Sequence, residues 1–413
     1  MIMDNLLLEK YAKLLVYTGV NLQKGQRLVI NSPVECAYFA RMINEEAYRA
    51  GAKDVIMDWN DGFCTRQHYL YADDSVFEQV SPWTSLMKNS LAEEGAAYIV
   101  IDAEDPEMLT GTDPGRLKKF SNARGRDLKT FYHLEMTNGF PWCIASIPIP
   151  SWAVKVFPDC SEEEAMNRLW DAILKTVHID AEHDPVEEWK KHCSRLEGRA
   201  ARMNEYHFRS LHYTNSLGTD LTIKMPEDHV WISGREKCKA GLPFIANMPT
   251  EEVFSAPLKY SAEGVVCASK PLVLNGSIVS GIKLRLEEGR IVEVHADTNE
   301  DMLKASIDTD DGSHYFGEIA LVQYDSPISN SGILFYNTLF DENASCHFAY
   351  GEAYPGCIEG GDDMSLDELK DHGINAESDM HIDFMVGTPD LSIVGTTADG
   401  RQVEVFRNGN FTF

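Results

Sequence analysis

The stretch QRLVINSPVECAYFARMINEEAYRAGAKDVIMDW, residues 26–59, holds the pattern that decides the fold of the N-terminal half. Its first seven residues predict a short buried strand, and DVIMDW predicts a second one. Between them, Pro33 opens a run with helical spacing that ends at Gly51. Apolar strands joined by a helix favour a parallel sheet that is covered on both faces.

The same alternation of strand and helix patterns continues to about residue 180. It predicts a helix near residues 75–94, a strand in AAYIVIDAED, a helix over roughly 115–136, a strand in WCIASIPIP and a helix after the N-cap Ser161. We therefore predict an α/β domain with a parallel, doubly wound type of sheet over residues 1–183. No glycine-rich phosphate loop follows the first strand, so a role as scaffold or substrate wall is favoured over nucleotide binding.

Residues 184–206 are polar and highly charged, and they predict a helix that bridges to a second domain. From His207 onward the signals change to short strands and turns, with hairpin-type turns at Asn275-Gly276 and Glu288-Gly289. We expect residues 207–413 to form an α+β catalytic domain whose strands are mostly antiparallel.

A chain of 413 residues with 44% hydrophobic residues is long enough to bury large cores without disulfides. Its net charge is −28, and residues 241–413 hold 29 acidic but only 9 basic side chains. Such a chain repels phosphates, which argues against nucleic acid and membranes as partners. The nine scattered cysteines lack a C-x-x-C pair and favour the reducing cytoplasm, and no apolar run reaches the roughly 18 residues of a membrane span.

The acidic excess is greatest between Lys304 and Arg401, where 19 carboxylates accompany a single cation, Lys370. Crowded carboxylates repel one another unless a bound divalent ion supplies positive charge. The same stretch contains His347 and His381, and imidazole with carboxylate is the ligand set of zinc, cobalt and manganese hydrolase sites. We therefore predict a metal centre with two ions in the C-terminal half.

Two segments place candidate ligands on predicted strands. In HIDFMVG, His381 and Asp383 would point to the same strand face, about 7 Å apart along the strand. In FGEIALV, Glu318 stands among apolar residues near a strand start, where a carboxylate needs a partner and a metal ion would supply one. The H-x-D pair alone is equally compatible with a hydrogen-bonded surface pair.

Two further segments carry candidates at less regular spacing. DENASCHFAYG predicts a helix start with Asp341 as N-cap, so Glu342 and His347 would converge only through their long side chains. In NMPTEEVFSAP, Glu251 and Glu252 precede an apolar segment. No H-E-x-x-H, G-x-S-x-G or kinase motif occurs, so nothing in the sequence favours those catalytic classes.

Together these segments resemble the thermophilic-aminopeptidase family of metallopeptidases, of the aminopeptidase T and aminopeptidase S type. The resemblance extends over the whole chain and rests on five segments in the same order: LEKYAKLLVYTGVNLQKGQRLVINSP, NMPTEEVFSAP, GEIALV, LFDENASCHFAYGEAYP and HIDFMVGTPDLSIVG. It implies a two-metal exopeptidase that removes N-terminal amino acids from peptides with a free N-terminus. It also implies an α/β N-terminal domain, a C-terminal catalytic domain and a homodimer.

Carried over by motif, the resemblance implies the metal ligands and an active-site tyrosine. The ligands would be Glu252, Glu318, Glu342, His347, His381 and Asp383, and the tyrosine would be Tyr354 of EAYPG. Zinc or cobalt is expected for the two divalent ions, with magnesium and manganese as alternatives. We expect Glu318 to bridge the ions and Tyr354 to donate a hydrogen bond to the developing oxyanion, and Glu251 is a candidate general base.

Two other functions stay open at this point. A different metal-dependent amide hydrolase, a dipeptidase or a deacylase, would share the ligands and differ in what fills the site. A non-enzymatic protein that binds calcium through oxygen ligands alone would leave the histidines as bystanders, although no D-x-[DN]-x-[DN]-G loop occurs. Loss of tight metal binding in His347→Ala would separate a zinc-type site from a calcium-type site.

Overall fold

The computed structural model describes residues 5–274 and 277–413. Contacts divide the chain into two compact units. The first comprises the residues up to His192 together with Arg235–Pro249, and the second comprises Cys193–Gly234 and Thr250–Phe413. Arg235–Pro249 therefore returns to the unit formed by the N-terminal half, which patterns read along the sequence do not reveal. The domain limits of 1–183 and 207–413 stay a prediction.

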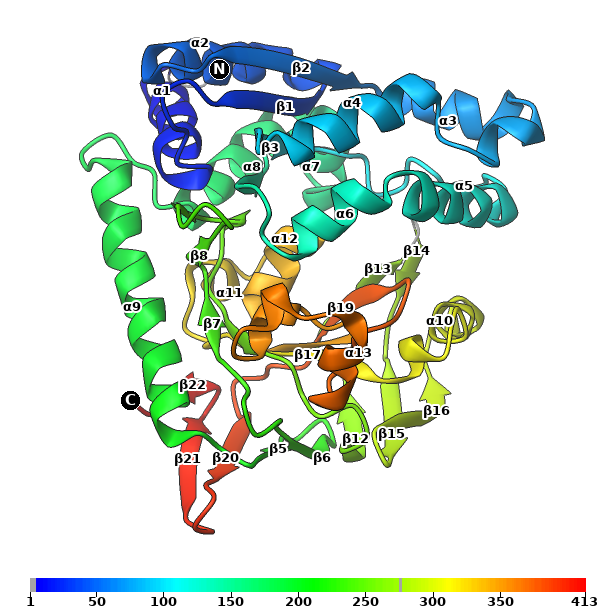
Figure 1. Ribbon diagram of the computed structural model, residues 1–413, viewed down its shortest axis with the longest axis vertical. Coiled ribbons are helices and arrows are strands. Elements are labelled where there is room, and N and C mark those ends of the chain that lie inside the picture. The colour runs from blue at the N-terminus through cyan, green and yellow to red at the C-terminus, as the bar shows by residue number, and fades with distance from the viewer. Residues whose placement is uncertain (1–4, 275–276) are drawn as a thin grey trace. The chain divides into compact units, whose positions relative to one another are not determined.

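A five-stranded sheet in the order β10-β4-β3-β1-β2 forms the centre of the first unit (Figure 1). β1 pairs in parallel with β2 and β3, and β4 pairs in parallel with β3 and β10. The predicted parallel α/β sheet is therefore confirmed. The strands are β1 (Arg27–Pro33), β2 (Asp54–Asn60), β3 (Ala97–Ile101), β4 (Trp142–Ala145) and β10 (Asn247–Met248).

Residues 26–59 form the predicted strand, helix and strand. α2 (Ala37–Ala50) joins β1 to β2 after a short 3₁₀ turn, η2 (Val34–Cys36). The helix ends at Gly51, which has a φ of +95° and donates its N–H to the carbonyls of the last turn. Glycine takes this left-handed conformation at little cost, so it terminates the helix and turns the chain into β2.

The other helices of the first unit differ from the predictions mainly in extent. The helix expected over 115–136 is divided at Leu128, and the one expected near 75–94 begins at Pro82 after a 3₁₀ turn. α3 was not predicted, because it buries no side chain and so lacks an apolar stripe. The bounds are α1 (Asn5–Leu14), η1 (Leu15–Gly19), α3 (Gly62–Tyr71), η3 (Asp74–Phe77), α4 (Pro82–Glu93), α5 (Pro114–Asp127), α6 (Lys129–Met136), α7 (Pro150–Val156) and α8 (Glu162–Thr176).

Two helix predictions are confirmed. The hydroxyl of Ser161 accepts a hydrogen bond from the backbone N–H of Glu164 at 3.3 Å, which makes it the N-cap of α8. The helix predicted over 184–206 is α9 (Pro185–Tyr206), and the division between the two units falls within it.

Within the described residues, two large antiparallel sheets and one two-stranded antiparallel sheet form the second unit, which confirms the mostly antiparallel α+β prediction. One large sheet has the order β16-β15-β12-β6-β5-β20-β21-β22 and the other the order β19-β18-β17-β11-β7. The eight strands of the first are β5 (Ser210–Thr214), β6 (Asp220–Lys224), β12 (Glu263–Cys267), β15 (Lys283–Glu287), β16 (Arg290–His295), β20 (Ser392–Thr396), β21 (Gln402–Arg407) and β22 (Asn410–Phe411). The five strands of the second are β7 (Ile232–Ser233), β11 (Val253–Ser255), β17 (Phe316–Leu321), β18 (His347–Gly351) and β19 (His381–Met385).

The predicted hairpin turn at Glu288-Gly289 joins β15 to β16, and both residues have positive φ. The turn predicted at Asn275-Gly276 lies outside the described residues, between β13 (Leu272–Leu274) and β14 (Ser277–Val279). The remaining elements are β8 (Glu236–Lys237), β9 (Pro243–Phe244), α10 (Glu300–Ile307), η4 (Gly312–His314), α11 (Pro327–Ser331), α12 (Thr338–Asp341), η5 (Glu342–Ala344), η6 (Pro355–Cys357), η7 (Gly361–Asp363) and α13 (Leu366–Asp371).

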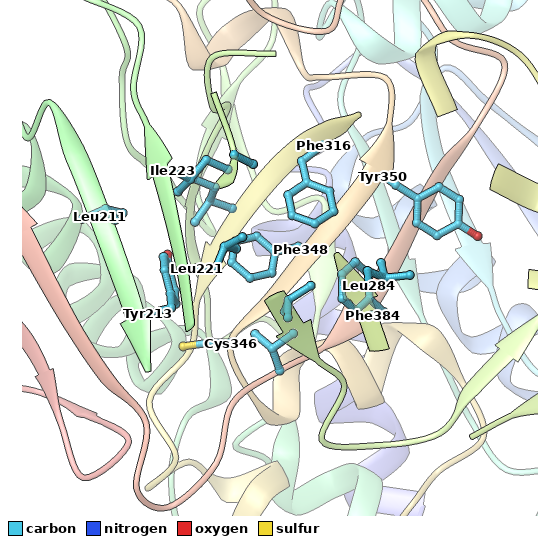
Figure 2. Packing of buried hydrophobic residues seen from close by; sticks show 14 of the residues in the cluster. Leu211, Tyr213, Leu221, Ile223, Leu284, Phe316, Cys346, Phe348, Tyr350 and Phe384 are labelled. Carbon is cyan, nitrogen blue, oxygen red and sulfur yellow. The ribbon is translucent and has the colours of Figure 1, made fainter. Parts of the chain in front are cut away.

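The apolar faces of the two sheets meet in the core of the second unit (Figure 2). Phe316 of β17 stacks on Phe348 of β18 with ring centroids 5.0 Å apart, and Tyr213 of β5 meets Phe348 edge to face at 5.1 Å. Phe384 of β19 packs beside both phenylalanines. Since side chains alternate along a strand, the residues next to these aromatics face the opposite side of the five-stranded sheet. Within the described residues, no helix combines the length and apolar composition that a bilayer crossing requires.

Candidate metal centre

The five-stranded sheet of the second unit, β19-β18-β17-β11-β7, has one face on this core and one face pointing away from it. The face that points away carries most of the candidate ligands. β18 lies between β17 and β19, and Ala349 on β18 is the register partner of both Glu318 and Asp383. Residues in one register row point to the same face, so the two carboxylates flank Ala349. His347 and His381 lie two positions from members of this row and therefore share its face.

The small side chain of Ala349 keeps the middle of the row uncrowded. Two positions further along β18 on the same face, Gly351 pairs with His381, so beyond His347 the central strand places only a methyl group and a hydrogen among the candidate ligands. A β-bulge interrupts the β17 register between Phe316 and Glu318. Residues two apart on a regular strand point to the same face. The bulge changes this, so that Phe316 faces the core and Glu318 faces the candidate site; bulges often redirect a side chain in this way.

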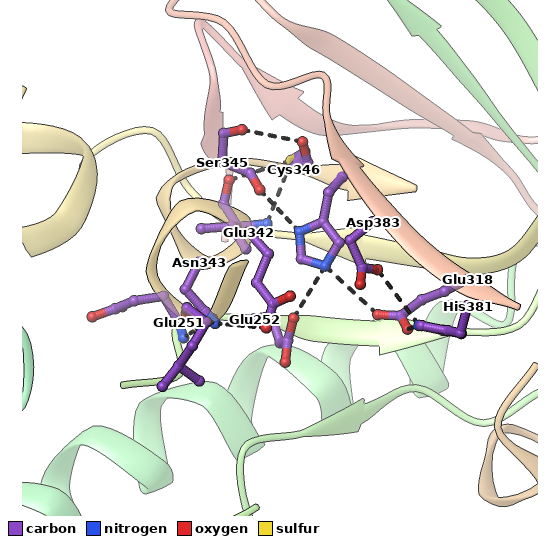
Figure 3. Close-up of polar contacts among 12 residues, drawn as sticks. Glu251, Glu252, Glu318, Glu342, Asn343, Ser345, Cys346, His381 and Asp383 are labelled. Carbon is purple, nitrogen blue, oxygen red and sulfur yellow. Dashed lines mark hydrogen bonds and ion pairs between the residues drawn. The ribbon is translucent and has the colours of Figure 1, made fainter. Parts of the chain in front are cut away.

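Two groups of acid and imidazole result, and Glu318 belongs to both (Figure 3). In the first group, the His347 Nε2 atom lies 3.3 Å from Glu252 Oε2 and 3.7 Å from Glu318 Oε1. In the second, the His381 Nε2 atom lies 3.2 Å from Glu318 Oε2 and 3.5 Å from Asp383 Oδ1. Within each group the candidate ligand atoms lie within 4.8 Å of one another.

Glu342 lies close enough to the first group for its charge to interact with Glu252, Glu318 and His347. Figure 3 shows its side chain pointing toward the same place as Glu252. The helix start predicted at DENASCH is a single 3₁₀ turn: Asp341 is the N-cap residue of η5, which begins at Glu342, and His347 begins β18 instead of continuing a helix. The chain turns sharply between them, so a spacing of five residues brings the two side chains together without a helix. The alternation of His347, Ala349 and Gly351 with Phe348 and Tyr350 is the strand signal that the helix prediction overlooked.

The backbone orients both imidazoles. Each ring presents Nδ1 to a main-chain carbonyl, that of Ser345 at 3.1 Å for His347 and that of Glu352 at 2.7 Å for His381. A carbonyl can only accept, so Nδ1 of each ring carries the proton in the neutral tautomer. Nε2, which faces the carboxylates, is then available as a metal ligand, as is usual for histidine ligands held by a carbonyl.

The charges in this cluster are unbalanced. Burial raises the pKa of Glu252, and burial together with the nearby Asp383 and Glu252 raises that of Glu342 well above its ordinary value. Burial opposes protonation of His347, but the carboxylates of Glu252 and Glu318 raise its pKa well above the ordinary range, and Asp383 and Glu318 do the same for His381. Without metal, Glu252 and Glu342 are therefore easier to protonate than free carboxyls, and both imidazoles hold their proton more strongly than a free imidazole.

Divalent metal ions fit this donor set. The six side chains offer carboxylate oxygens and imidazole Nε2 atoms, which are the ligands preferred by zinc, cobalt and manganese. Two divalent ions carry the positive charge that four carboxylates require, and the described residues place no lysine or arginine in either group. The neighbouring Cys346 belongs to the apolar core instead, where its thiol donates to the Val322 carbonyl at 3.2 Å.

Comparison with known proteins agrees with this geometry. The family model of thermophilic metalloproteases, M29, matches residues 4–411. This chain belongs to the M29 family. It is 45% identical to aminopeptidase AmpS of Bacillus subtilis and 40% identical to aminopeptidase 2 of Geobacillus stearothermophilus, in both cases over 406 residues and 98% of each chain. The solved structure of AmpT from Thermus thermophilus has a TM-score of 0.91 and 35% identity, and the match covers 98% of this chain and 99% of that one.

In this M29 chain, Tyr354 lies beside the second group and Glu251 outside both. The Tyr354 ring meets the His381 ring edge to face with centroids 5.0 Å apart, just before η6. Glu251 is buried next to Glu252, and its backbone N–H donates to Asn343 Oδ1 at 2.7 Å. Burial raises the pKa of the Glu251 carboxyl to about 7, although the positive charges of Arg199 and Arg195 oppose the shift.

Several residues that the sequence reasoning missed surround the M29 site. Glu352 supplies the carbonyl that orients His381, and Asn343 connects Glu251 to η5. Arg199, on α9, places a half-buried guanidinium near Glu251. A backbone carbonyl has no sequence signature, and Arg199 is 52 positions before Glu251 in the chain, so only a three-dimensional structure could identify these roles.

Without metal, the crowded carboxylates should destabilise this M29 protein. A carboxylate at Glu342 raises the free energy of the folded state whether it stays charged beside its neighbours or takes up a proton. We expect Glu342→Gln to stabilise the chelator-treated protein by roughly 1–3 kcal/mol and to lower the metal-induced gain in Tm. Thermal unfolding with and without chelator measures both effects, and Glu359→Gln, an exposed substitution, is the control. A metal-free Glu342→Gln protein less stable than metal-free wild type would contradict the prediction.

Proposed function

We propose that this chain is a two-metal aminopeptidase that removes amino acids from the free N-terminus of peptides. The observation that carries the proposal is the position of Glu318, whose two oxygens face different imidazoles at 3.7 and 3.2 Å. A carboxylate shared between two acid-imidazole groups is suited to bridging two ions. The relatives named aminopeptidases support the choice of peptide substrates.

In this proposal, Glu252, Glu342 and His347 hold one ion, His381 and Asp383 hold the other, and Glu318 contacts both. Zinc or cobalt suits the mixed oxygen and nitrogen donors, and magnesium or manganese is the alternative. When bound, such ions act as Lewis acids toward a carbonyl oxygen and make water acidic enough to attack near neutral pH. The three adjacent strands β17, β18 and β19 carry four of the six proposed ligands, and Glu252 and Glu342 come from the position just before β11 and from η5.

The proposal gives Tyr354 and Glu251 the remaining chemical roles. The hydroxyl of Tyr354 donates a hydrogen bond to the oxygen that becomes negative as the peptide carbon turns tetrahedral, supported by its ring contact with His381. Glu251 accepts a proton from the attacking water, supported by its buried position next to Glu252. An unchanged kcat in Glu251→Gln would reject that second role.

Removing the Tyr354 hydroxyl should slow the chemical step. We expect Tyr354→Phe to lower kcat about 10²–10³-fold with a smaller change in KM, because a hydrogen bond to an oxyanion strengthens only in the transition state. The ring contacts with Phe254 and His381 persist in the variant, so Tm should change little. Steady-state kinetics on an aminoacyl anilide measure the effect, and a kcat equal to that of wild type would exclude the role.

A metal add-back assay tests the proposed activity. Protein stripped with a chelator is given zinc, cobalt, manganese or magnesium and assayed on free aminoacyl anilides and on the same compounds with an acetylated N-terminus. We expect activity to vanish on stripping, to return with one or more ions, and to require the free amine. Activity only on the acylated compounds would favour a deacylase, and folded, metal-loaded protein without activity on either would reject the proposal.

The proposal includes a homodimer in the cytoplasm. Large exposed apolar side chains on α3 and α4 offer a surface for association, namely Phe63, Tyr71, Trp83 and Leu86. Most cysteines are buried thiols, as expected in a reducing compartment. A monomer in light scattering would reject the dimer, and recovery of the protein outside the cytoplasm would reject the location.

A further inference from the structure

A buried asparagine in the segment that leads into β19 anchors the end of β18 from behind. Asn375 is fully buried, and its Nδ2 donates to the carbonyls of Gly351 at 2.5 Å, Gly312 at 2.8 Å and Tyr315 at 3.4 Å. Three acceptors around one amide nitrogen settle its orientation. Among the residues that the structure describes, none bonds to its Oδ1, so the side chain serves only as a donor.

Asn375 holds residues 351–353 at both ends. Its side chain binds the Gly351 carbonyl, and its own backbone carbonyl accepts the N–H of Ala353 at 2.8 Å. Between these two points, Glu352 presents the carbonyl that accepts from His381 Nδ1 and donates its N–H to the Met380 carbonyl at 2.6 Å. The carbonyl that orients His381 therefore lies at the middle of a three-residue segment fixed by Asn375.

The close approach at Gly351 makes this arrangement sensitive to small shifts. Gly351 has a φ of +111°, and a Cβ atom built there would lie 1.9 Å from the Met380 carbonyl oxygen. The backbone just before His381 thus runs directly against the end of β18, which the Asn375 amide anchors. Gly351 is the register partner of His381, and the next residue, Glu352, supplies the carbonyl that orients the His381 ring. A shift of Gly351 would therefore move that carbonyl and the backbone paired with His381.

We infer that Asn375 is a positioning residue that fixes the His381 imidazole for metal binding through Gly351 and Glu352. It touches neither the candidate ligand atoms nor the substrate. Groups that orient metal-binding histidines from behind commonly change metal affinity about 10–100-fold when they are lost. The inference rests on the proposed role of His381 as a ligand, and it adds a residue that the acid and imidazole pattern does not contain.

The test compares Asn375→Ala and Asn375→Ser with Asn204→Ala. Asn204, also in the second unit, exchanges two hydrogen bonds with the backbone of Trp231 and lies outside the metal groups, so it matches the loss of a structural amide. Competition with a coloured chelator measures zinc and cobalt affinity, and the visible absorption of the cobalt-loaded proteins reports ligand geometry. Urea unfolding measures stability in the same samples.

We expect Asn375→Ala to lower metal affinity about 10–100-fold and to alter the cobalt spectrum, with a smaller effect in the serine variant, which keeps one donor. Asn204→Ala should bind metal within about twofold of wild type at a comparable loss of stability. Affinity and spectrum equal to those of the Asn204 control would overturn the inference, and so would failure of both Asn375 variants to fold, which would make Asn375 a structural residue. If wild type itself binds no metal, the proposed function fails instead.

Discussion

Replacing Glu318 with glutamine is expected to abolish activity while leaving the fold intact. Both oxygens of Glu318 face imidazoles, so the substitution removes one charge and one acceptor from both acid-imidazole groups at once. A loss of about 4 kcal/mol of transition-state stabilisation corresponds to roughly a 10³-fold lower kcat. We expect at least that decrease, together with weaker binding of two equivalents of metal in calorimetric titration.

A glutamine at position 318 keeps the volume of the side chain and still donates or accepts hydrogen bonds, so unfolding is not the expected cause of inactivity. Glu359→Gln serves as the control, because this substitution removes the same charge from the same unit at an exposed position outside the metal groups. Loss of one metal equivalent alone, with the second ion bound as in wild type, would show that Glu318 does not bridge the ions. A fully active Glu318→Gln enzyme would place the metal chemistry elsewhere.

Enlarging Ala349 should have an effect of similar size for a steric reason. Ala349 stands between Glu318 and Asp383 in the register row, and its methyl group points to the face that carries the ligands. A leucine there would bring three further carbon atoms among the carboxylates and imidazoles. We expect Ala349→Leu to weaken metal binding by more than about 100-fold and to lower stability by about 1–3 kcal/mol.

The control is Ala262→Leu, which overfills the apolar core of the same unit instead of the ligand face. Both variants should lose stability, but only Ala349→Leu should lose metal affinity, as measured by chelator competition and by activity after metal addition. Equal affinity in the two variants would mean that the metal ions do not lie over the centre of β18. A milder Ala349→Ser variant, nearly isosteric with alanine, should bind metal close to wild type.

The parallel sheet could be predicted from the sequence because its strands are continuous apolar runs and its first connection ends at a helix-terminating glycine, Gly51. The antiparallel half could be predicted as a class but not strand by strand, since its strands are short and alternate. His347 shows the limit: the segment that resembled a helix start is a tight 3₁₀ turn followed by β18. The alternation of residues 347–351 favoured a strand, and in the folded chain the packing of Phe348 and Tyr350 in the core selects it.

The sequence alone determined which residue types are present for chemistry. Acidic residues without neighbouring cations, two histidines and the H-x-D spacing on a strand were sufficient to predict a metal centre, because carboxylates that fold together away from water need a counter-charge. Only the tertiary structure decided how the candidate ligands are distributed between the two acid-imidazole groups. Glu252, Glu318 and His347 are separated by up to 95 positions, and only the pairing of β17 with β18 and of β18 with β19 places Glu318 between the two imidazoles. Sheet register depends on long-range packing, and therefore the shared position of Glu318 and the support from Asn375 are visible only in the folded chain.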